Sequence, residues 1–366
     1  MTLRETGILP DSRIAGLFDS GVLTTPAELA PDQIQPASLD LRLGAKAWRV
    51  RASFLPGSDC RVADKLERLK LHEIDLKDGA VLETGCVYIV PLLEELALPA
   101  EISASANPKS STGRLDIFTR VMTDYGHEFD KIAAGYRGPL YIEISPRTFP
   151  VIARTGSRLT QIRFRRGLAL LDEETLATLH RDETLVAAES PSISGNGIAL
   201  TVDLGGDGEG LIGYRGKHHT GLVDVDKREA HSVLDYWEPL YGRGKRELVL
   251  DPDEFYILMS REAVHVPPDF AAEMTPFDPL VGEFRVHYAG FFDPGFGHSA
   301  AGGTGSRAVL EVRSHEVPFI LDHGQIVGRL VYEHMIERPK ALYGSDLGSN
   351  YQAQGLKLSK HFRAGA

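Results

Sequence analysis

The sequence predicts a mainly β protein made of two similar domains. Short alternating or β-branched runs are separated by Gly and Pro, which is typical of antiparallel strands. The length of 366 residues exceeds what one hydrophobic core usually fills. Related segments also recur at a fixed shift along the chain, a pattern that chance rarely produces.

A short helix is expected at the start of the chain. The stretch DSRIAGLFDSGVL spaces Ile14, Leu17 and Phe18 helically behind Asp11, a residue type that caps helices. Gly21 is a stop signal for this helix. The first element is therefore predicted to be helical, ahead of a β body.

Strands are predicted in four runs after this helix: ASLDLRLG, AVLETGCVYIVPL, GPLYIEISP and FPVIARTGSRLTQIRF. Residues 171–192 then change to helix formers, followed by a Ser/Pro link. We place the domain boundary in this stretch, which gives a first domain of residues 1–180 and a second of residues 181–366.

The repeated segments indicate a tandem duplication. GCVYIVPLLEELALPAEI resembles DEFYILMSREAVHVPPDF, and Phe255 follows Val87 by 168 residues. PLYIEIS resembles AVLEVRS with the same shift of 168 between Glu143 and Glu311, and FPVIARTG resembles VPFILDHG at that shift again. PASLDLRLG and NGIALTVDLG match more weakly. Two related β domains are therefore expected in one chain.

Composition excludes several classes of function. The net charge of -11 gives no general electrostatic footprint for nucleic acid, so any anion site must be local. Cys60 and Cys86 are too few for a disulfide framework and cannot form a Cys-x-x-Cys metal site. No apolar run approaches a membrane span, and the first residues lack the features of a signal peptide. A cytoplasmic protein is expected.

The stretch NPKSSTGRLDI, residues 107–117, contains a polar cluster of Lys109, Ser110, Ser111 and Arg114 in a run bounded by proline and glycine. Hydroxyls and a guanidinium can bind an anion or stabilise developing charge. From the residues alone, an ordinary polar turn is the alternative, with Glu143 a solvent-facing strand residue.

The order of the segments adds a resemblance. IQPASLDLRLG, KSSTGRLDI, AGYRGPLYIEI and GSRLTQIRF, with the tail NYQAQGLKLSKHF, resemble the dCTP deaminase branch of the deoxyuridine triphosphatase-like fold. The resemblance covers nearly all of residues 7–168, is weaker over 193–336 and is good again in the tail. It implies two distorted β-barrels, a homo-oligomer with a trimer favoured, sites between neighbouring barrels, and a nucleoside triphosphate bound with magnesium.

The resemblance also implies the reaction, deamination of dCTP to dUTP with release of ammonia. A water must attack C4 of cytosine while a base takes its proton and donors stabilise the developing charge. By resemblance Glu143 is the general base, Ser111 and Arg114 orient the water and polarise the ring, and Lys109 with Ser110 contacts phosphate. Zinc is not expected, because two isolated cysteines do not provide the ligands of zinc-dependent deaminases. An inhibitory role for dTTP belongs to the same resemblance.

Further nucleotide-binding residues are expected by resemblance. Val121 and Thr123 would offer backbone groups and a small side chain to the cytosine edge, and Gln161 would line the nucleotide site. Tyr351 and Gln354 would reach the nucleotide when the tail closes. The alternatives are an edge strand without a ligand, a polar rim residue and a disordered terminus, respectively.

The second half lacks part of the cluster. Opposite NPKSSTGR it has DPLVGEFR, in which Val281 and Gly282 replace the serines. Its YAGFFDPGFG resembles the deoxyuridine triphosphatase sugar-binding motif, with Asp293 in the acidic place. A composite site using Asp293 or Glu311 therefore stays open, although Glu143 and a ring of first domains are preferred.

Two other functions remain open at this point. The first is a deaminase that also hydrolyses the triphosphate, or a deoxyuridine triphosphatase, within the same fold. The second is a non-catalytic nucleotide-binding regulator with one degenerate half.

Overall fold

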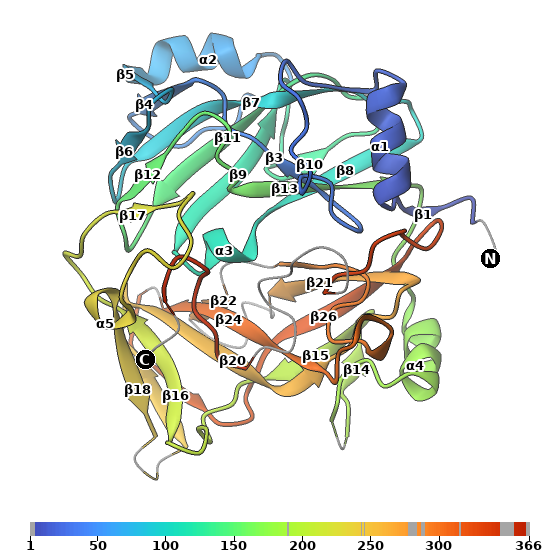
Figure 1. The fold of residues 1–366 in the computed structure, drawn as a ribbon, viewed down its shortest axis with the longest axis vertical. Helices are drawn as coiled ribbons and strands as arrows, with labels where there is room; N and C mark the ends of the chain where they lie inside the picture. Colours follow the sequence, from blue (N-terminus) through green and yellow to red (C-terminus); the bar gives the residue numbers. More distant parts are fainter. Residues whose placement is uncertain are drawn as a thin grey trace.

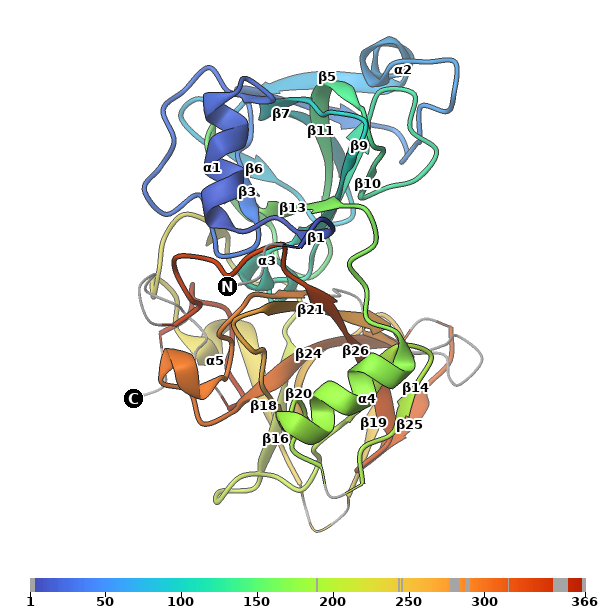
Figure 2. The same cartoon turned by 90° about the vertical axis from the view of Figure 1, so that its right-hand side faces the viewer.

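The structure is a computed structural model that describes residues 4–188, 190–242, 244, 246–276, 284–286, 290–314, 316–344 and 355–363. It is mainly β, which confirms the predicted fold class. Two β units lie one above the other along the longest axis, and the short helix α3 (Ser110–Gly113) lies where they meet (Figure 1). Figure 2 shows the same stacking from the side.

The first unit contains three sheets. One has the order β1-β13-β8-β10, with β3 also pairing β13, and the second has the order β5-β4-β7-β11-β9, with β2 also pairing β7. The third, β17-β12-β6, includes a strand from the second half of the chain. Their bounds are β1 Gly7–Ile8, β2 Leu23–Thr24, β3 Leu39–Leu41, β4 Lys46–Val50, β5 Lys70–Asp75, β6 Ala80–Leu82, β7 Val87–Ala97, β8 Ile102–Pro108, β9 Ile117–Thr123, β10 Lys131–Ile132, β11 Arg137–Pro146, β12 Val151–Ala153, β13 Thr160–Arg166 and β17 Val223–Asp224.

The second unit also contains three sheets, with the orders β14-β15-β26-β21-β23, β18-β16-β20-β24-β22 and β19-β25. Their bounds are β14 Ile193–Ser194, β15 Gly197–Thr201, β16 Leu211–Gly216, β18 Trp237–Tyr241, β19 Glu247–Leu250, β20 Phe255–Val264, β21 Phe270–Pro276, β22 Phe284–Val286, β23 Phe291–Phe292, β24 Ser306–Ser314, β25 Phe319–Asp322 and β26 Ile326–His334.

Short helices complete the described chain: α1 Asp11–Asp19, α2 Val62–Leu69, α3, α4 Glu173–Asp182, α5 Val233–Tyr236 and the 3-10 turn η2 Ser299–Ala301. None of the helices in the described ranges is long and apolar enough to cross a membrane. The helix expected at the start and the helix-forming stretch before the predicted boundary are both present. The boundary itself stays a prediction, although α4 buries Leu176 in the core of the second unit.

The expected cap of α1 is wrong in one detail. Asp11 is the first helical residue, Pro10 takes the cap position, and no side chain caps the helix. The Asp11 carboxylate instead accepts hydrogen bonds from the backbone N–H groups of Lys340 and Ala341, each at 3.0 Å. An acid in the first turn still suits the positive end of the helix dipole. The residue therefore links the start of the chain to a late segment.

Strand pairing follows the repeat. In the first unit Glu143 of β11 lies opposite Ile89 of β7, and in the second Glu311 of β24 lies opposite Ile257 of β20. Both members of the second pair follow their counterparts by 168 residues. The same register therefore recurs in both units, as a duplication predicts.

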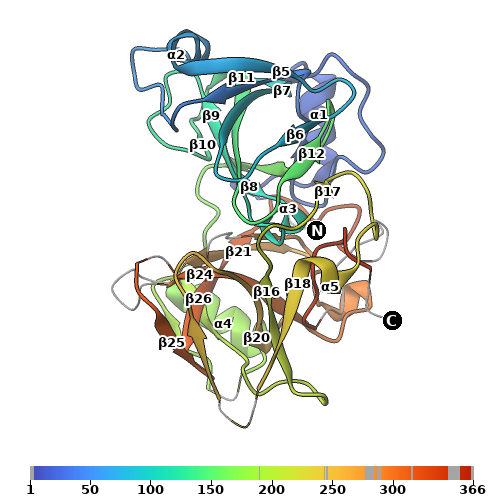
Figure 3. The ribbon, with the colours of Figure 1, turned by 90° about the vertical axis from the view of Figure 1, so that its left-hand side faces the viewer.

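The larger hydrophobic core is not confined to one unit. The larger core combines apolar residues of the first unit with Trp237, Phe255 and Ile257 of the second and with Leu358 and Phe362 of the C-terminal segment. The aromatic rings at this junction meet edge to face, as Trp237 and Phe362 do at 5.8 Å. Figure 3 shows β17, α5 and the junction from the left-hand side. The two units therefore share a continuous apolar interface.

Candidate functional site

The cluster predicted from the sequence lies at this junction. Strand β8 ends at Pro108, and the N–H groups of Thr112 and Gly113 bond back to the carbonyl of Lys109, which forms the single turn α3. Asp116 then takes a left-handed conformation with φ 54°, which turns the chain into β9. This tight turn buries the side chains of Ser111 and Arg114 between the two units.

Arg114 meets a carboxylate from the other unit. Its Nε atom lies 3.9 Å from Oε1 of Glu311, and the side chains are only 4% and 5% exposed. Burial raises the pKa of Glu311 to about 8, while the Arg114 guanidinium opposes this shift. A glutamate with such a pKa can give up and take back a proton near neutral pH.

The C-terminal segment lies across this cluster. Arg114 Nη1 donates to the carbonyl of Lys357 at 2.8 Å, and Ser359 Oγ lies 2.7 Å from the carbonyl of Ser111. His361 and Phe362 anchor the segment, because the His361 ring bonds to the Val225 carbonyl and Phe362 enters the shared core. The predicted tail residues Tyr351 and Gln354 lie outside the described residues.

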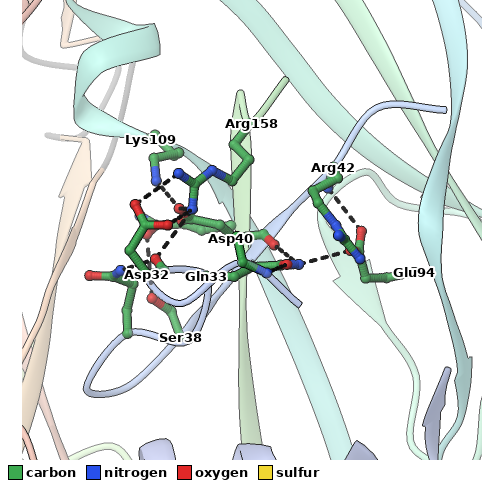
Figure 4. Close-up of polar contacts among 11 residues, drawn as sticks. Asp32, Gln33, Ser38, Asp40, Arg42, Glu94, Lys109 and Arg158 are labelled. Atoms are coloured by element: carbon green, nitrogen blue, oxygen red, sulfur yellow. Dashed lines mark hydrogen bonds and ion pairs between the residues drawn. The ribbon is translucent and has the colours of Figure 1, made fainter. Parts of the chain in front are cut away.

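Cations gather beside α3. Lys109 forms an ion pair with Asp40, and Arg158 lies 3.4 Å from the same carboxylate and 2.8 Å from Asp32. Figure 4 shows Lys109 and Arg158 converging on these two acids. Burial, together with nearby cations of which Lys109 has the largest effect, lowers the pKa of Lys360 to about 8. The group therefore carries an excess of positive charge close to Ser111.

A polar network of Gln33, Arg42 and Glu94 adjoins Asp40, to its right in Figure 4. Gln33 Nε2 donates to the Asp40 carbonyl at 2.9 Å and to Glu94 at 2.8 Å, and Arg42 donates to Glu94 at 2.8 Å. The Asp40 Oδ1 atom is buried and has no hydrogen-bond partner. One oxygen of the Asp40 carboxylate therefore accepts no hydrogen bond from the described residues.

The remaining nucleotide-binding candidates occupy two places. Ser110 opens α3, and Gln161 on β13 lies opposite Asp40 with its Oε1 3.4 Å from Ser38 Oγ, so both lie beside the cations. Val121 and Thr123 are buried on β9. The Val121 N–H already donates to an oxygen of Asp130 at 2.7 Å, so the amide expected to read the base is occupied.

Glu143 lies elsewhere. Its Oε1 accepts from Arg120 at 2.6 Å, and the Arg120 guanidinium packs on the rings of Phe118 and Phe129, at 4.7 and 3.6 Å. Its Oε2 is buried without a partner. The expected base therefore has its own arginine within the first unit, whereas Arg114 has Glu311.

The segment between β4 and β5 explains this difference. In the first unit residues 51–69 fold back as α2, and Val62, Leu66 and Phe54 pack on Ile89, the residue opposite Glu143. In the second unit the matching segment, 217–236, crosses the junction, where β17 pairs with β12 of the first unit. The surface around Ile257 and Glu311 is instead covered by the first unit.

Asp293, the other composite candidate, also meets a residue of the first unit. Arg163 is fully buried, donates to Asp293 Oδ1 at 3.1 Å and to the Ala272 carbonyl at 3.0 Å, and lies on the Phe291 ring at 4.1 Å. Burial raises the pKa of Asp293, and Arg163 opposes the shift. Asp293 is thus already paired with a cation close to Asp40 and Lys109.

Sequence reasoning did not single out Arg158, Arg163 or Lys360. Both arginines stand in GSRLTQIRF, and strand alternation places Arg163 on the same face as Gln161, which is a signal that it lines the site. Arg158, an odd number of residues away from both, had no such signal. Lys360 carried no comparable signal, because its approach to Lys109 depends on how the tail docks.

A buried glutamate beside an arginine, next to a cationic patch, fits an enzyme that transfers a proton while it binds an anionic substrate. The family model of the 2'-deoxycytidine 5'-triphosphate deaminase (DCD) N-terminal domain matches residues 5–168, and that of the C-terminal domain matches residues 172–362. The chain belongs to the dCTP deaminase family.

Known proteins similar to this chain carry the same description. A dCTP deaminase from Haloarcula marismortui is 30% identical over 163 residues, 43% of this chain and 79% of that protein. A dUMP-forming dCTP deaminase from Coprothermobacter proteolyticus is 29% identical over 160 residues, 43% of this chain and 81% of that protein. The crystal structure of 2'-deoxycytidine 5'-triphosphate deaminase from Agrobacterium tumefaciens is 73% identical with a TM-score of 0.90, and the match covers 94% of this chain and all of that one.

Proposed function

We propose that this chain deaminates dCTP to dUTP with release of ammonia, at one site that both β units build. Membership of the dCTP deaminase family supports the reaction. The observation that carries the location is the buried approach of Arg114 to Glu311 across the junction. Glu311 is therefore our candidate for the proton-transferring carboxylate, in place of the Glu143 favoured from the sequence.

The proposed chemistry uses the neighbouring groups as follows. Glu311 takes a proton from the water that attacks C4 and returns a proton to the departing amine, which leaves as ammonia. Arg114 stays charged and stabilises the charge that develops on the ring, and Ser111 orients the water. Because the pKa of Glu311 is raised to about 8, both of its forms are populated around neutral pH. That balance suits a group that must both accept and donate a proton.

The triphosphate is assigned to the cationic side of the site. Lys109, Arg158 and Lys360 provide charge, and Ser110 at the start of α3 adds a hydroxyl. Magnesium is expected to arrive with the triphosphate, and the unpartnered Oδ1 of Asp40 fits it, because Mg²⁺ often takes one carboxylate oxygen plus phosphate oxygens. When bound, the ion would neutralise part of the phosphate charge. Zinc has no role in this proposal.

Further hydrolysis to dUMP is the second candidate. It is favoured by the description of the Coprothermobacter proteolyticus relative as dUMP-forming and by Asp293, which lies in the motif that resembles deoxyuridine triphosphatase. In this chain Asp293 is paired with Arg163, so it would have to exchange this partner to activate a water.

Arg114 and Glu311, the central residues of the proposed site, come from the same chain. The trimer implied by the resemblance stays a prediction, and assembly is not needed to bring Arg114 and Glu311 together. Inhibition by dTTP and a cytoplasmic location also stay predictions.

A single assay tests the function. The protein is incubated with dCTP or with dUTP, in magnesium, and ammonia and nucleotides are measured, the latter by chromatography. Ammonia with accumulating dUTP supports the deaminase, and dUMP with pyrophosphate supports the second candidate. Nucleotide binding without turnover would overturn both and favour a regulatory protein.

A further inference from the structure

A second ion pair crosses the junction next to Arg114 and Glu311. Arg313 of β24 pairs with the Asp116 carboxylate of the first unit. Thr148 Oγ1 donates to Asp116 Oδ2 at 2.6 Å and lies 3.1 Å from Arg313 Nη2. Asp116 is 1% exposed and Arg313 6%, so this pair is as deeply buried as the first.

In the first pair the first unit supplies the cation and β24 the anion, and in the second pair these roles are reversed. The two charged residues on each side are separated by the same number of positions. Arg114 and Asp116 lie two residues apart on the first unit, and Glu311 and Arg313 lie two residues apart on β24. Alternate residues of a strand project to the same face, so Glu311 and Arg313 face the junction together. A slip of two residues would place Arg114 opposite Arg313, or Asp116 opposite Glu311. Like charges so close in a dry interface repel strongly, so only one register is favourable.

Asp116 lies close along the chain to Arg114, so an ion pair between these two residues would compete with the approach of Arg114 to Glu311. Both lie in the same tight turn, where Asp116 is held at φ 54° by the backbone. A buried carboxylate without a cation is strongly unfavourable. Removal of Arg313 would take positive charge away from the buried Asp116 carboxylate, and Arg114, two residues away in the same turn, is the nearest cation along the chain that could move toward it.

We propose that Arg313 and Asp116 are positioning residues that hold Glu311 and Arg114 in register for deamination. This inference rests on the proposed role of Glu311. Arg313 fixes the strand that carries Glu311, and it pairs with a buried carboxylate toward which Arg114 could otherwise move.

The duplication explains how only the second unit carries an arginine at this position. The residue that matches Arg313 in the first unit, at the shift of 168, is Ser145, whose short side chain cannot form such a pair. The two units have diverged at this position while both keep the preceding glutamate, Glu143 or Glu311. The positioning pair is therefore specific to the junction that carries the proposed site.

Four variants test the proposal: Arg313→Gln, Arg313→Lys, Asp116→Asn and the double variant Arg313→Gln/Asp116→Asn. Asparagine tolerates the left-handed backbone of position 116. Arg313→Gln should lower kcat for dCTP by about 10- to 100-fold, since small misplacements of reacting groups have effects of this size, with KM within about twofold. Arg313→Lys should recover most of kcat, and the double variant should exceed Arg313→Gln because the competing carboxylate is removed.

Arg154→Gln is the matched control. Arg154 forms a bidentate ion pair with Asp224 across the same junction, at 2.6 and 2.7 Å, away from β24. Because the Arg154 side chain is 31% exposed, Arg154→Gln should lower Tm less than Arg313→Gln, and it should leave kcat unchanged. If Arg313→Gln does not fold, the kcat values of Arg313→Lys and of the double variant test the positioning role instead.

Unchanged kcat in Arg313→Gln, or an equal loss in Arg154→Gln, would overturn the positioning role. Absence of dCTP deamination by the wild-type protein would instead show that the proposed function is wrong, and full activity in Glu311→Gln would show that Glu311 is not the proton-transferring carboxylate.

Discussion

Glu143 and Glu311 occupy the same place in two related strands but have different arginine partners. Glu143 lies opposite Ile89 and accepts from Arg120 of its own unit, at 2.6 Å. Glu311 lies opposite Ile257 and faces Arg114 of the other unit, 3.9 Å away. This difference in partner is the ground on which we propose Glu311, and not Glu143, as the proton-transferring carboxylate.

The first prediction compares these glutamates. Glu311→Gln should lower the rate of ammonia release from dCTP about 100-fold or more, because an amide cannot accept the proton of water. Glu143→Gln should keep activity close to that of wild type. The reverse result would support the assignment made from the sequence and contradict ours.

A second prediction concerns pH and stability. The folded-state pKa of Glu311, about 8, lies above its ordinary value of 4.5, so the folded protein binds an extra proton between these values. Its contribution to stability is therefore present at low pH and declines as pH rises through this range. The Tm of Glu311→Gln relative to wild type should be higher at pH 9 than at pH 5. Calorimetry at both pH values checks this, and a pH-independent difference would contradict the raised pKa.

A mixing experiment tests whether the site lies in one chain. Inactive Arg114→Ala and inactive Glu311→Gln chains are unfolded together and refolded. We expect no recovery of activity, because no single chain would hold both intact groups. Recovery in oligomers that contain both variants would place the site between chains, as the ring of first domains preferred from the sequence requires.

The cationic group should affect binding more than chemistry. Lys360→Gln is expected to raise KM for dCTP about tenfold, the size expected for loss of one charge-assisted contact, with kcat little changed. Lys46→Gln is the control, since Lys46 is an exposed cation that pairs with Glu73. A similar rise in both variants would show that general charge, and not the site, is responsible.

Metal dependence is the fifth prediction. Prolonged treatment with a zinc chelator, followed by restoration of magnesium, should leave ammonia release intact. Activity that returns only after addition of zinc would contradict the proposed chemistry.

Much of the fold was predictable because local patterns encode it. The alternation in GPLYIEISP predicts β11, and the constant shift of 168 residues predicts two units with matching register. The cluster of Ser111 and Arg114 was also found locally, since its residues are close in sequence. These features depend on short-range periodicity and turn chemistry.

The partner of Arg114 could not be predicted in this way. YIEIS and VLEVRS are nearly equivalent strand patterns, so neither identifies which glutamate faces Arg114. Which glutamate faces Arg114 depends on how the segments 51–69 and 217–236 pack on the strands that carry the two glutamates. Lys360 and Arg313 likewise meet their neighbours only through the packing of distant parts of the chain.

The two matching connections, residues 51–69 and 217–236, have a consequence for how such a chain can change over time. In a ring of identical subunits, one gene encodes both sides of every interface, so a substitution must suit both roles at once. Here one copy of the connection covers its own unit and the other reaches across to its neighbour. Mutations around Arg120 and Glu143 are thereby uncoupled from those around Glu311, and the two copies of an ancestral surface are free to evolve independently.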